Sequence, residues 1–272
     1  MLKTMKKVNN KINFYKYLKY IGRKNLNSEN IKLKNNFELK KKIVKEIKQH
    51  GYYVIKNFLD QKECKSIIKK IDSFVKNYPK LIWTDKIKSD TRIFGAEYID
   101  PKIENFFKNK FINDIGSLLL KKKLSSLMIM ANKVVPKDKN LGSGQGWHKD
   151  SYAKQFKSIL YLSDVKTGNG PFQLIEKTKD PMFDFQLFYK YEKSLKNTRF
   201  SEKEVKSISK NKKKIINVYG KKGTLILVDT SLIHRGMPIK KGKRYALTNY
   251  MYPKNSLKNF DKHFLPRIKR RI

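Results

Sequence analysis

The chain has little cysteine, little acid and no long apolar run. Its one cysteine, Cys64, excludes an internal disulfide and favours a reducing, cytoplasmic location. No apolar run approaches the roughly 20 residues that a helix needs to cross a bilayer. The basic N-terminus is not followed by an apolar segment, so we expect no secretory signal. These features argue against a disulfide-stabilised or membrane-spanning protein.

The shortage of acid leaves a strong positive charge. There are 23 Asp and Glu against 64 Lys and Arg, a formal net charge of +41. Such an excess is typical of proteins that meet nucleic acid, anionic membranes or anionic substrates. Most of the basic residues are lysines spread along the chain, however, and lysine lacks the planar fork that reads base edges. We therefore favour a solvated basic surface and expect no specific nucleic-acid partner.

A chain of 272 residues with 12% aromatics can bury a substantial core. We expect a basic N-terminal extension over residues 1–36, a single domain over 37–255, and a basic tail over 256–272 that holds the cluster 267–271. In the extension, aromatic and aliphatic residues recur at helical spacing. This helix either lies on an anionic membrane or packs on the protein's own core, and we slightly favour the core. The residues concerned are Phe14, Tyr17, Leu18 and Ile21.

Helices are expected at the start of the domain and short strands after it. The patterns predict a helix over 37–50 that Gly51 ends, a strand over 52–55 and a helix that Asp60 begins. His50 and Cys64 fit these helices as structural residues. Strands are predicted over 127–135, 156–165, 172–175, 215–218, 224–229 and 244–252, with Gly and Pro turns between several of them. The pattern predicts an α+β fold with a mainly β core of the jelly-roll type, interrupted by a lid-like insert over 177–214.

Residues 146–150 carry the strongest chemical signal. His148 and Asp150 are two apart, so on a strand both side chains point to one side. With the distant His234 they can form a set of two histidines and one carboxylate, as in non-haem Fe(II) oxygenases. Arg244 follows ten residues later and can grip a carboxylate bidentately. Each of these residues has an ordinary structural explanation when taken alone, and only the combination points to a metal site.

Asn132 is the polar exception in the apolar strand 127–135. A buried amide needs hydrogen-bonding partners. It either satisfies the scaffold or points at a ligand, and the sequence favours neither.

At this point the sequence resembles the phytanoyl-CoA dioxygenase family of Fe(II)/2-oxoglutarate oxygenases. The resemblance covers about residues 50–253 and keeps the family's order of motifs. It rests on residues 51–55, 147–150, 161–165, 168–172, 223–227, 234–236 and 244–248.

The resemblance implies a double-stranded β-helix, a cupin-like jelly roll, with flanking N-terminal helices. It implies His148, Asp150 and His234 as the iron ligands and catalytic centre. Arg244 becomes the partner of the far carboxylate of 2-oxoglutarate, and Asn132 a second contact to it. The cofactors implied are Fe(II), 2-oxoglutarate as cosubstrate and O2, with hydroxylation of a small molecule and release of succinate and CO2. Halogenating relatives have a small residue where Asp150 stands, so the chain resembles a hydroxylase.

Two departures from the family concern the surroundings of this centre. Where many relatives have Gly-Ser-His, this chain has Glu176-Lys177-Thr178, and two residues past His234 it has Gly236 in place of a hydroxyl residue. The substrate is not readable from the residues, but the positive charge suits an anionic, sugar-linked or lipid-linked compound. We expect Arg92 and the insert to contact it.

Two other classes of function stay open. One is a barrel that has lost turnover and serves as a binding protein. The other is a protein that binds polyanions or the membrane surface, with peripheral contact to an anionic membrane through the basic N-terminus.

Overall fold

The computed structural model describes residues 12–21, 36–210 and 213–253. His263 and the basic tail lie outside the described residues, and so does most of the N-terminal extension. Within the described ranges, no helix has the length and apolar character that crossing a membrane requires.

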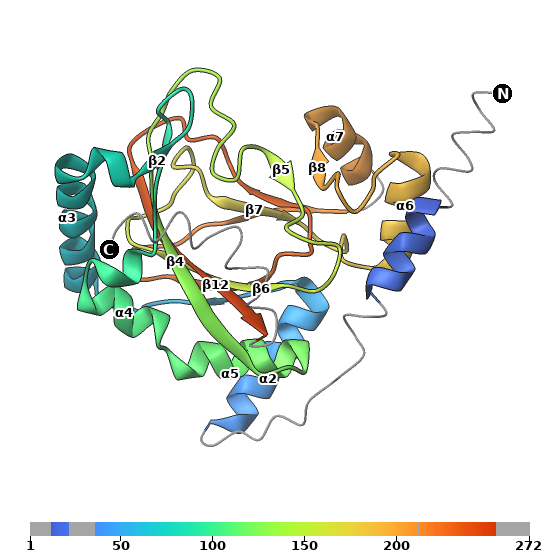
Figure 1. Ribbon diagram of the computed structural model, residues 1–272, viewed down its shortest axis with the longest axis horizontal. Helices are drawn as coiled ribbons and strands as arrows, with labels where there is room; N and C mark the ends of the chain where they lie inside the picture. Colours follow the sequence, from blue (N-terminus) through green and yellow to red (C-terminus); the bar gives the residue numbers. More distant parts are fainter. Residues whose placement is uncertain (1–11, 22–35, 211–212, 254–272) are drawn as a thin grey trace.

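The helices between residues 37 and 120 lie together on one side of the molecule (Figure 1). The predicted first helix is confirmed as α2 (Phe37–His50), and Gly51 ends it with a φ of 92°. α3 (Gln61–Asn77) begins at Asp60, whose side chain accepts a hydrogen bond from the Lys62 backbone N–H. The short helices η1 (Pro79–Leu81) and η2 (Ala96–Tyr98), then α4 (Pro101–Phe107) and α5 (Lys110–Leu120), follow. The apolar faces of these helices pack on a sheet, with Cys64 fully buried among them.

Among the described residues the strands form two antiparallel sheets. The larger has the order β1 (Tyr52–Ile55), β10 (Leu225–Asp229), β6 (Phe156–Tyr161), β12 (Arg244–Pro253), β4 (Leu124–Val134), β3 (Asp90–Phe94) and β2 (Trp83–Thr84). The smaller has the order β8 (Arg199–Phe200), β5 (Trp147–His148), β11 (His234–Gly236), β7 (Phe172–Ile175) and β9 (Ile215–Val218).

Alternation along the larger sheet separates two faces. On β12, Tyr245 and Leu247 pack against the helices, whereas Arg244, Ala246 and Thr248 face the smaller sheet. Apolar residues of both sheets also meet in a second layer of core. The predicted jelly-roll fold is therefore confirmed as two facing sheets, and no closed barrel is formed by the part of the chain described.

The insert predicted over residues 177–214 has secondary structure of its own. It contains α6 (Pro181–Lys190), the short strand β8 and α7 (Glu202–Lys210), and β8 pairs with β5. The N-terminal helix (residues 12–21) lies beside α6 (Figure 1), with Phe14 4.8 Å from Phe185 between ring centroids. Its Tyr17 is buried in the core that α6 and α7 form, so packing on the protein's own core is confirmed for this helix.

Candidate active site

Two histidines from distant strands meet in register. His148 of β5 pairs directly with His234 of β11, and their ring centroids lie 4.4 Å apart. Asp150 lies two residues beyond His148, with Oδ1 3.7 Å from His148 Nε2 and Oδ2 3.7 Å from His234 Nε2. One donor atom from each of the three residues lies within 4.8 Å of the others, so the group could hold one metal ion.

Both imidazoles have the tautomer and the charge state that a metal ligand needs. The Nδ1 atoms of His148 and His234 lie 2.9 Å from the backbone carbonyls of Gly146 and Leu232. A carbonyl can only accept, so the proton sits on Nδ1 and the Nε2 lone pair faces the site. Burial lowers the pKa of His148, and it lowers the pKa of His234 to about 3. Both rings are therefore neutral at physiological pH, as metal binding requires.

Asp150 is held ionised by a buried lysine. Burial alone would raise the pKa of its carboxyl, but the Lys157 ammonium, 2.6 Å from Oδ2, lowers it well below the ordinary value. Lys157 comes from β6, is 6% exposed and lies over the ring of Tyr250. Sequence reasoning missed Lys157, although a lysine inside an apolar strand was a signal that could have found it.

Arg244 lies at the other side of the same cavity, which has a volume of about 340 Å³. Its guanidinium is buried, and Nη1 donates to the Gly170 carbonyl. Within the described residues Nε has no hydrogen-bonding partner. A buried N–H without a partner is costly, so this cavity fits an anionic ligand such as a carboxylate.

Two glycines allow these side chains to sit where they do. A Cβ at Gly236 would lie 2.8 Å from Ser143 Cβ and 3.0 Å from Arg244 Nη2, so a larger residue there would have to displace one of these side chains. A Cβ at Gly144 would lie only 2.4 Å from His148 Cε1.

Of the remaining residues that the sequence singled out, Asn132 and Arg92 lie at the cavity and His50 does not. Asn132 and Arg92, cross-strand neighbours on β4 and β3, both line the cavity. Asn132 donates to Ser143 Oγ at 3.2 Å. Arg92 is paired with Asp90 and stacked over Trp83, with 4.7 Å to the ring centroid. His50 is half-exposed near Glu46 and Glu176 and does not line the cavity, in agreement with a structural role.

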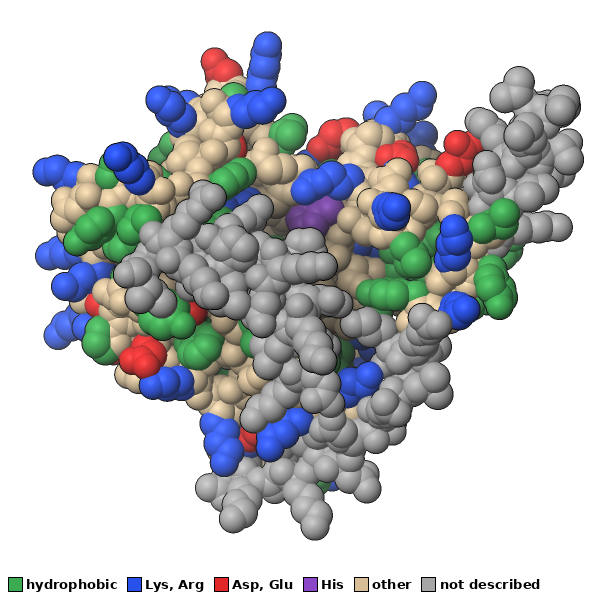
Figure 2. Space-filling view, in the orientation of Figure 1, with side chains coloured by type: hydrophobic (Ala, Val, Ile, Leu, Met, Phe, Trp, Pro, Cys, Tyr) green, Lys and Arg blue, Asp and Glu red, His purple; other side chains and the backbone are tan. Residues whose placement is uncertain are grey.

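The insert supplies a further cation that sequence reasoning did not single out. Arg199 of β8 is the register partner of His148, and it donates to the carbonyls of Gly144 and Gln145. Figure 2 shows histidine and basic side chains together at a hollow in this face of the molecule.

Solved structures similar to this chain include enzymes crystallised with 2-oxoglutarate, some of them also with a metal ion. The chain is similar to EctD from S. alaskensis, solved with 2-oxoglutarate and 5-hydroxyectoine, at 16% identity and a TM-score of 0.61, covering 85% of this chain and 82% of that one. It is similar to the epimerase SnoN, solved with Fe3+, alpha ketoglutarate and nogalamycin RO, at 12% identity and a TM-score of 0.59, covering 79% and 84%. It is also similar to HygX from Streptomyces hygroscopicus, solved with nickel, 2-oxoglutarate and hygromycin B, at 13% identity and a TM-score of 0.56, covering 78% and 87%.

At these identities the solved structures speak for the fold alone, and no curated protein matches the chain. The family itself is shown by sequence. A model of the phytanoyl-CoA dioxygenase (PhyH) family matches residues 47–244, which is most of the chain and includes His148, His234 and Arg244. The chain therefore belongs to the phytanoyl-CoA dioxygenase family.

Proposed function

We propose that this protein is an Fe(II)/2-oxoglutarate-dependent dioxygenase that hydroxylates a small molecule. The observation that carries the proposal is the meeting of His148, Asp150 and His234 beside the buried, incompletely paired Arg244. Two imidazoles and one carboxylate leave coordination positions open for a cosubstrate. The similar structures of EctD, SnoN and HygX support the proposal, because each was solved with 2-oxoglutarate, which is called alpha ketoglutarate for SnoN.

In this proposal the chain's own residues bind and orient. His148, Asp150 and His234 hold the iron, which supplies the oxygen-activating chemistry when bound. Arg244 grips the far carboxylate of 2-oxoglutarate, and Asn132, which lines the same cavity, makes a second contact. Lys157 keeps Asp150 ionised and aligned. Arg199 of the insert lines the same cavity and is held there by the carbonyls of Gly144 and Gln145.

The charges in the cavity favour an anionic substrate. Four basic side chains line it, against the single carboxylate of Asp150: Arg92, Lys157, Arg199 and Arg244. A divalent metal and the 2-oxoglutarate dianion cancel each other. Subtracting also Asp90, the buried partner of Arg92, leaves the cavity positive. We expect Arg92 to contact the negative group, which a phosphate or carboxylate of a sugar- or lipid-linked compound would supply.

The test of the cofactors is anaerobic titration of the protein with Fe(II) and 2-oxoglutarate. We expect the weak visible charge-transfer band of the ternary complex, and its loss in His148→Ala. Absence of the band together with absence of binding of either ligand would refute the proposal. Succinate release by the wild type in air, lost in His148→Ala, would exclude the alternative of a binding protein without turnover.

The reaction and substrate need a separate experiment. Metabolites compared between cells with and without the gene would identify candidate substrates, and turnover under ¹⁸O2 would show whether one labelled oxygen enters the product. Hydroxylation requires the label, whereas an epimerisation such as that named for SnoN would leave the product unlabelled. Arg92→Gln should raise the KM for an anionic substrate and leave the KM for 2-oxoglutarate near that of the wild type.

A further inference from the structure

A fully buried lysine lies between two of the candidate ligands. Lys149 follows His148 and precedes Asp150, so its side chain points away from the metal site and into the core beneath the insert. Its ammonium donates to Asp184 Oδ1 at 2.7 Å and to the Thr178 carbonyl at 2.5 Å. Around it lie the rings of Tyr152 and Phe183.

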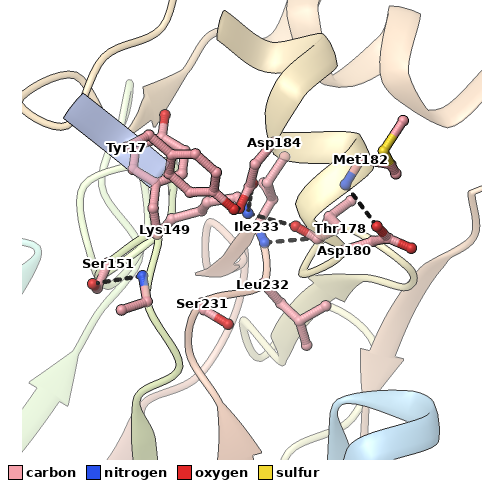
Figure 3. Close-up of polar contacts among 12 residues, drawn as sticks. Tyr17, Lys149, Ser151, Thr178, Asp180, Met182, Asp184, Ser231, Leu232 and Ile233 are labelled. Carbon is pink, nitrogen blue, oxygen red and sulfur yellow. Dashed lines mark hydrogen bonds and ion pairs between the residues drawn. The ribbon is translucent and has the colours of Figure 1, made fainter. Parts of the chain in front are cut away.

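The partner of this lysine is itself held by the N-terminal helix. Asp184 lies in α6, and its Oδ2 accepts a hydrogen bond of 3.0 Å from the Tyr17 hydroxyl. Figure 3 shows Tyr17, Lys149 and Asp184 converging from three separate segments of the chain. The same helix makes a second contact beside the site, where Tyr20 Oη lies 3.0 Å from Ser151 Oγ.

Thr178 extends the network to the third candidate ligand. Its carbonyl accepts from Lys149, and its hydroxyl accepts from the backbone N–H of Ile233 at 3.0 Å, next to His234. The hydroxyl also donates to the Ile175 carbonyl at 2.6 Å. Figure 3 shows Thr178 joined to both Lys149 and Ile233. The segments that carry His148, Asp150 and His234 are therefore braced from behind by one set of contacts.

A hydrophobic pair would fill this space without the desolvation cost of a buried charge. The charged pair instead fixes the position of the Lys149 side chain, because an ammonium that donates to both a carboxylate and a carbonyl can move little without breaking a hydrogen bond. The Lys149 backbone is held too, since its N–H donates to the Thr198 carbonyl at 2.9 Å. Any turn of β5 that misaligned His148 and Asp150 would break these contacts.

We propose that Lys149, Asp184 and Tyr17 are positioning residues that hold the metal ligands in place, so that metal affinity depends on the docking of α6 and of the N-terminal helix. The inference rests on the proposed function, since it needs a metal at His148, Asp150 and His234. It goes further by giving the insert and the N-terminal helix a role at the metal centre.

The test compares metal affinity with stability in two matched lysine–aspartate pairs. Lys40 and Asp114 also form a buried pair at 2.7 Å, but they join α2 to α5 on the far side of the larger sheet. We would prepare the full-length variants Asp184→Asn, Tyr17→Phe and Lys40→Met. For each, calorimetry would give the Kd for Co(II), and thermal unfolding would give the stability of the metal-free protein.

We expect Asp184→Asn to raise the Kd by about 10- to 100-fold, the usual effect of residues that orient metal ligands. Tyr17→Phe keeps the ring and removes one hydroxyl, so it should give a smaller rise in Kd with little loss of stability. Lys40→Met should lower the unfolding temperature and leave the Kd at the wild-type value.

Three outcomes would overturn the inference. The first is a wild-type Kd in both Asp184→Asn and Tyr17→Phe. The second is a rise in Lys40→Met as large as that in Asp184→Asn, because the effect would then follow stability. The third concerns the case in which Asp184→Asn does not fold. A wild-type Kd in Tyr17→Phe then suffices to overturn the inference. A wild-type protein that binds no Co(II) or Fe(II) would instead overturn the proposed function on which the inference rests.

Discussion

Gly144 and Gly146 form a natural pair for testing whether His148 binds the metal. Both have a left-handed backbone, with φ of +88° and +89°. An alanine at either position pays the same conformational penalty, about 1–2 kcal/mol. Their surroundings differ. The new Cβ at 144 would lie 2.4 Å from His148 Cε1, about 1 Å inside ordinary contact, whereas nothing lies within 4 Å of a Cβ at 146.

We therefore expect Gly144→Ala and Gly146→Ala to lower stability by similar amounts and metal affinity by different ones. For a domain of this size the common penalty corresponds to a fall of roughly 2–8 °C in Tm. Only Gly144→Ala must also displace the imidazole, which should raise the Kd for the metal by about 10- to 100-fold.

Calorimetric titration with Co(II), together with thermal unfolding of the metal-free proteins, measures both quantities. Equal metal affinities in the two variants would refute the placement of His148 as a ligand. A Tm loss confined to Gly144→Ala would contradict the shared backbone penalty.

Three further predictions follow from other parts of the molecule. Arg244→Gln should raise the KM for 2-oxoglutarate by about 10-fold or more, because it removes a charge-assisted bidentate pair, and Arg244→Lys should raise it by less. Steady-state assays of succinate release measure this KM, and an unchanged KM in Arg244→Gln would contradict the role of Arg244 in binding 2-oxoglutarate. Burial raises the pKa of the Cys64 thiol from 9.0 to about 11, so the folded protein holds this proton to a higher pH than the unfolded chain does. The contribution of the thiol to stability is therefore present below pH 9.0 and is lost as the pH rises through about 11. Between pH 8.5 and 10.5 the Tm of the wild type should fall more than that of Cys64→Ala, and equal falls in Tm would contradict this. The N-terminal helix keeps three apolar side chains exposed, those of Ile12, Tyr15 and Leu18. If this helix also contacts an anionic membrane, more protein should sediment with phosphatidylglycerol vesicles than with phosphatidylcholine vesicles. Equal sedimentation with the two lipids would argue against the membrane contact.

Local patterns in the sequence were enough to predict much of the fold. The bounds of α2, β1, β7 and β9 agree with the helix and strand signals, because side-chain periodicity and a terminating glycine act within a few residues. The jelly-roll prediction is confirmed for the same reason, since short strands separated by turn residues leave few ways to bury their apolar faces. The resemblance to the phytanoyl-CoA dioxygenase family is confirmed as well.

The strand β8 inside the insert could not be predicted from the sequence. It consists of two residues, Arg199 and Phe200, and it exists only because β5 offers an edge with which to pair. Residues this few carry no periodic signal, so their state depends on the partner strand.

The sequence by itself determined which residues could do the chemistry. His148 and Asp150 have the i, i+2 spacing that predicts two side chains on one side of a strand, and His234 and Arg244 lie next to strand signals. In the structure β5 ends at His148, and Asp150 lies in the bend that follows it.

Only the tertiary structure decided how these residues are held. Register places His234 opposite His148, and the alternation of β6 brings Lys157 to Asp150. The Tyr17–Asp184 contact joins residues 167 positions apart. Such contacts are made by segments that folding brings together, and a charge in the sequence does not say which distant partner it will meet once water is excluded.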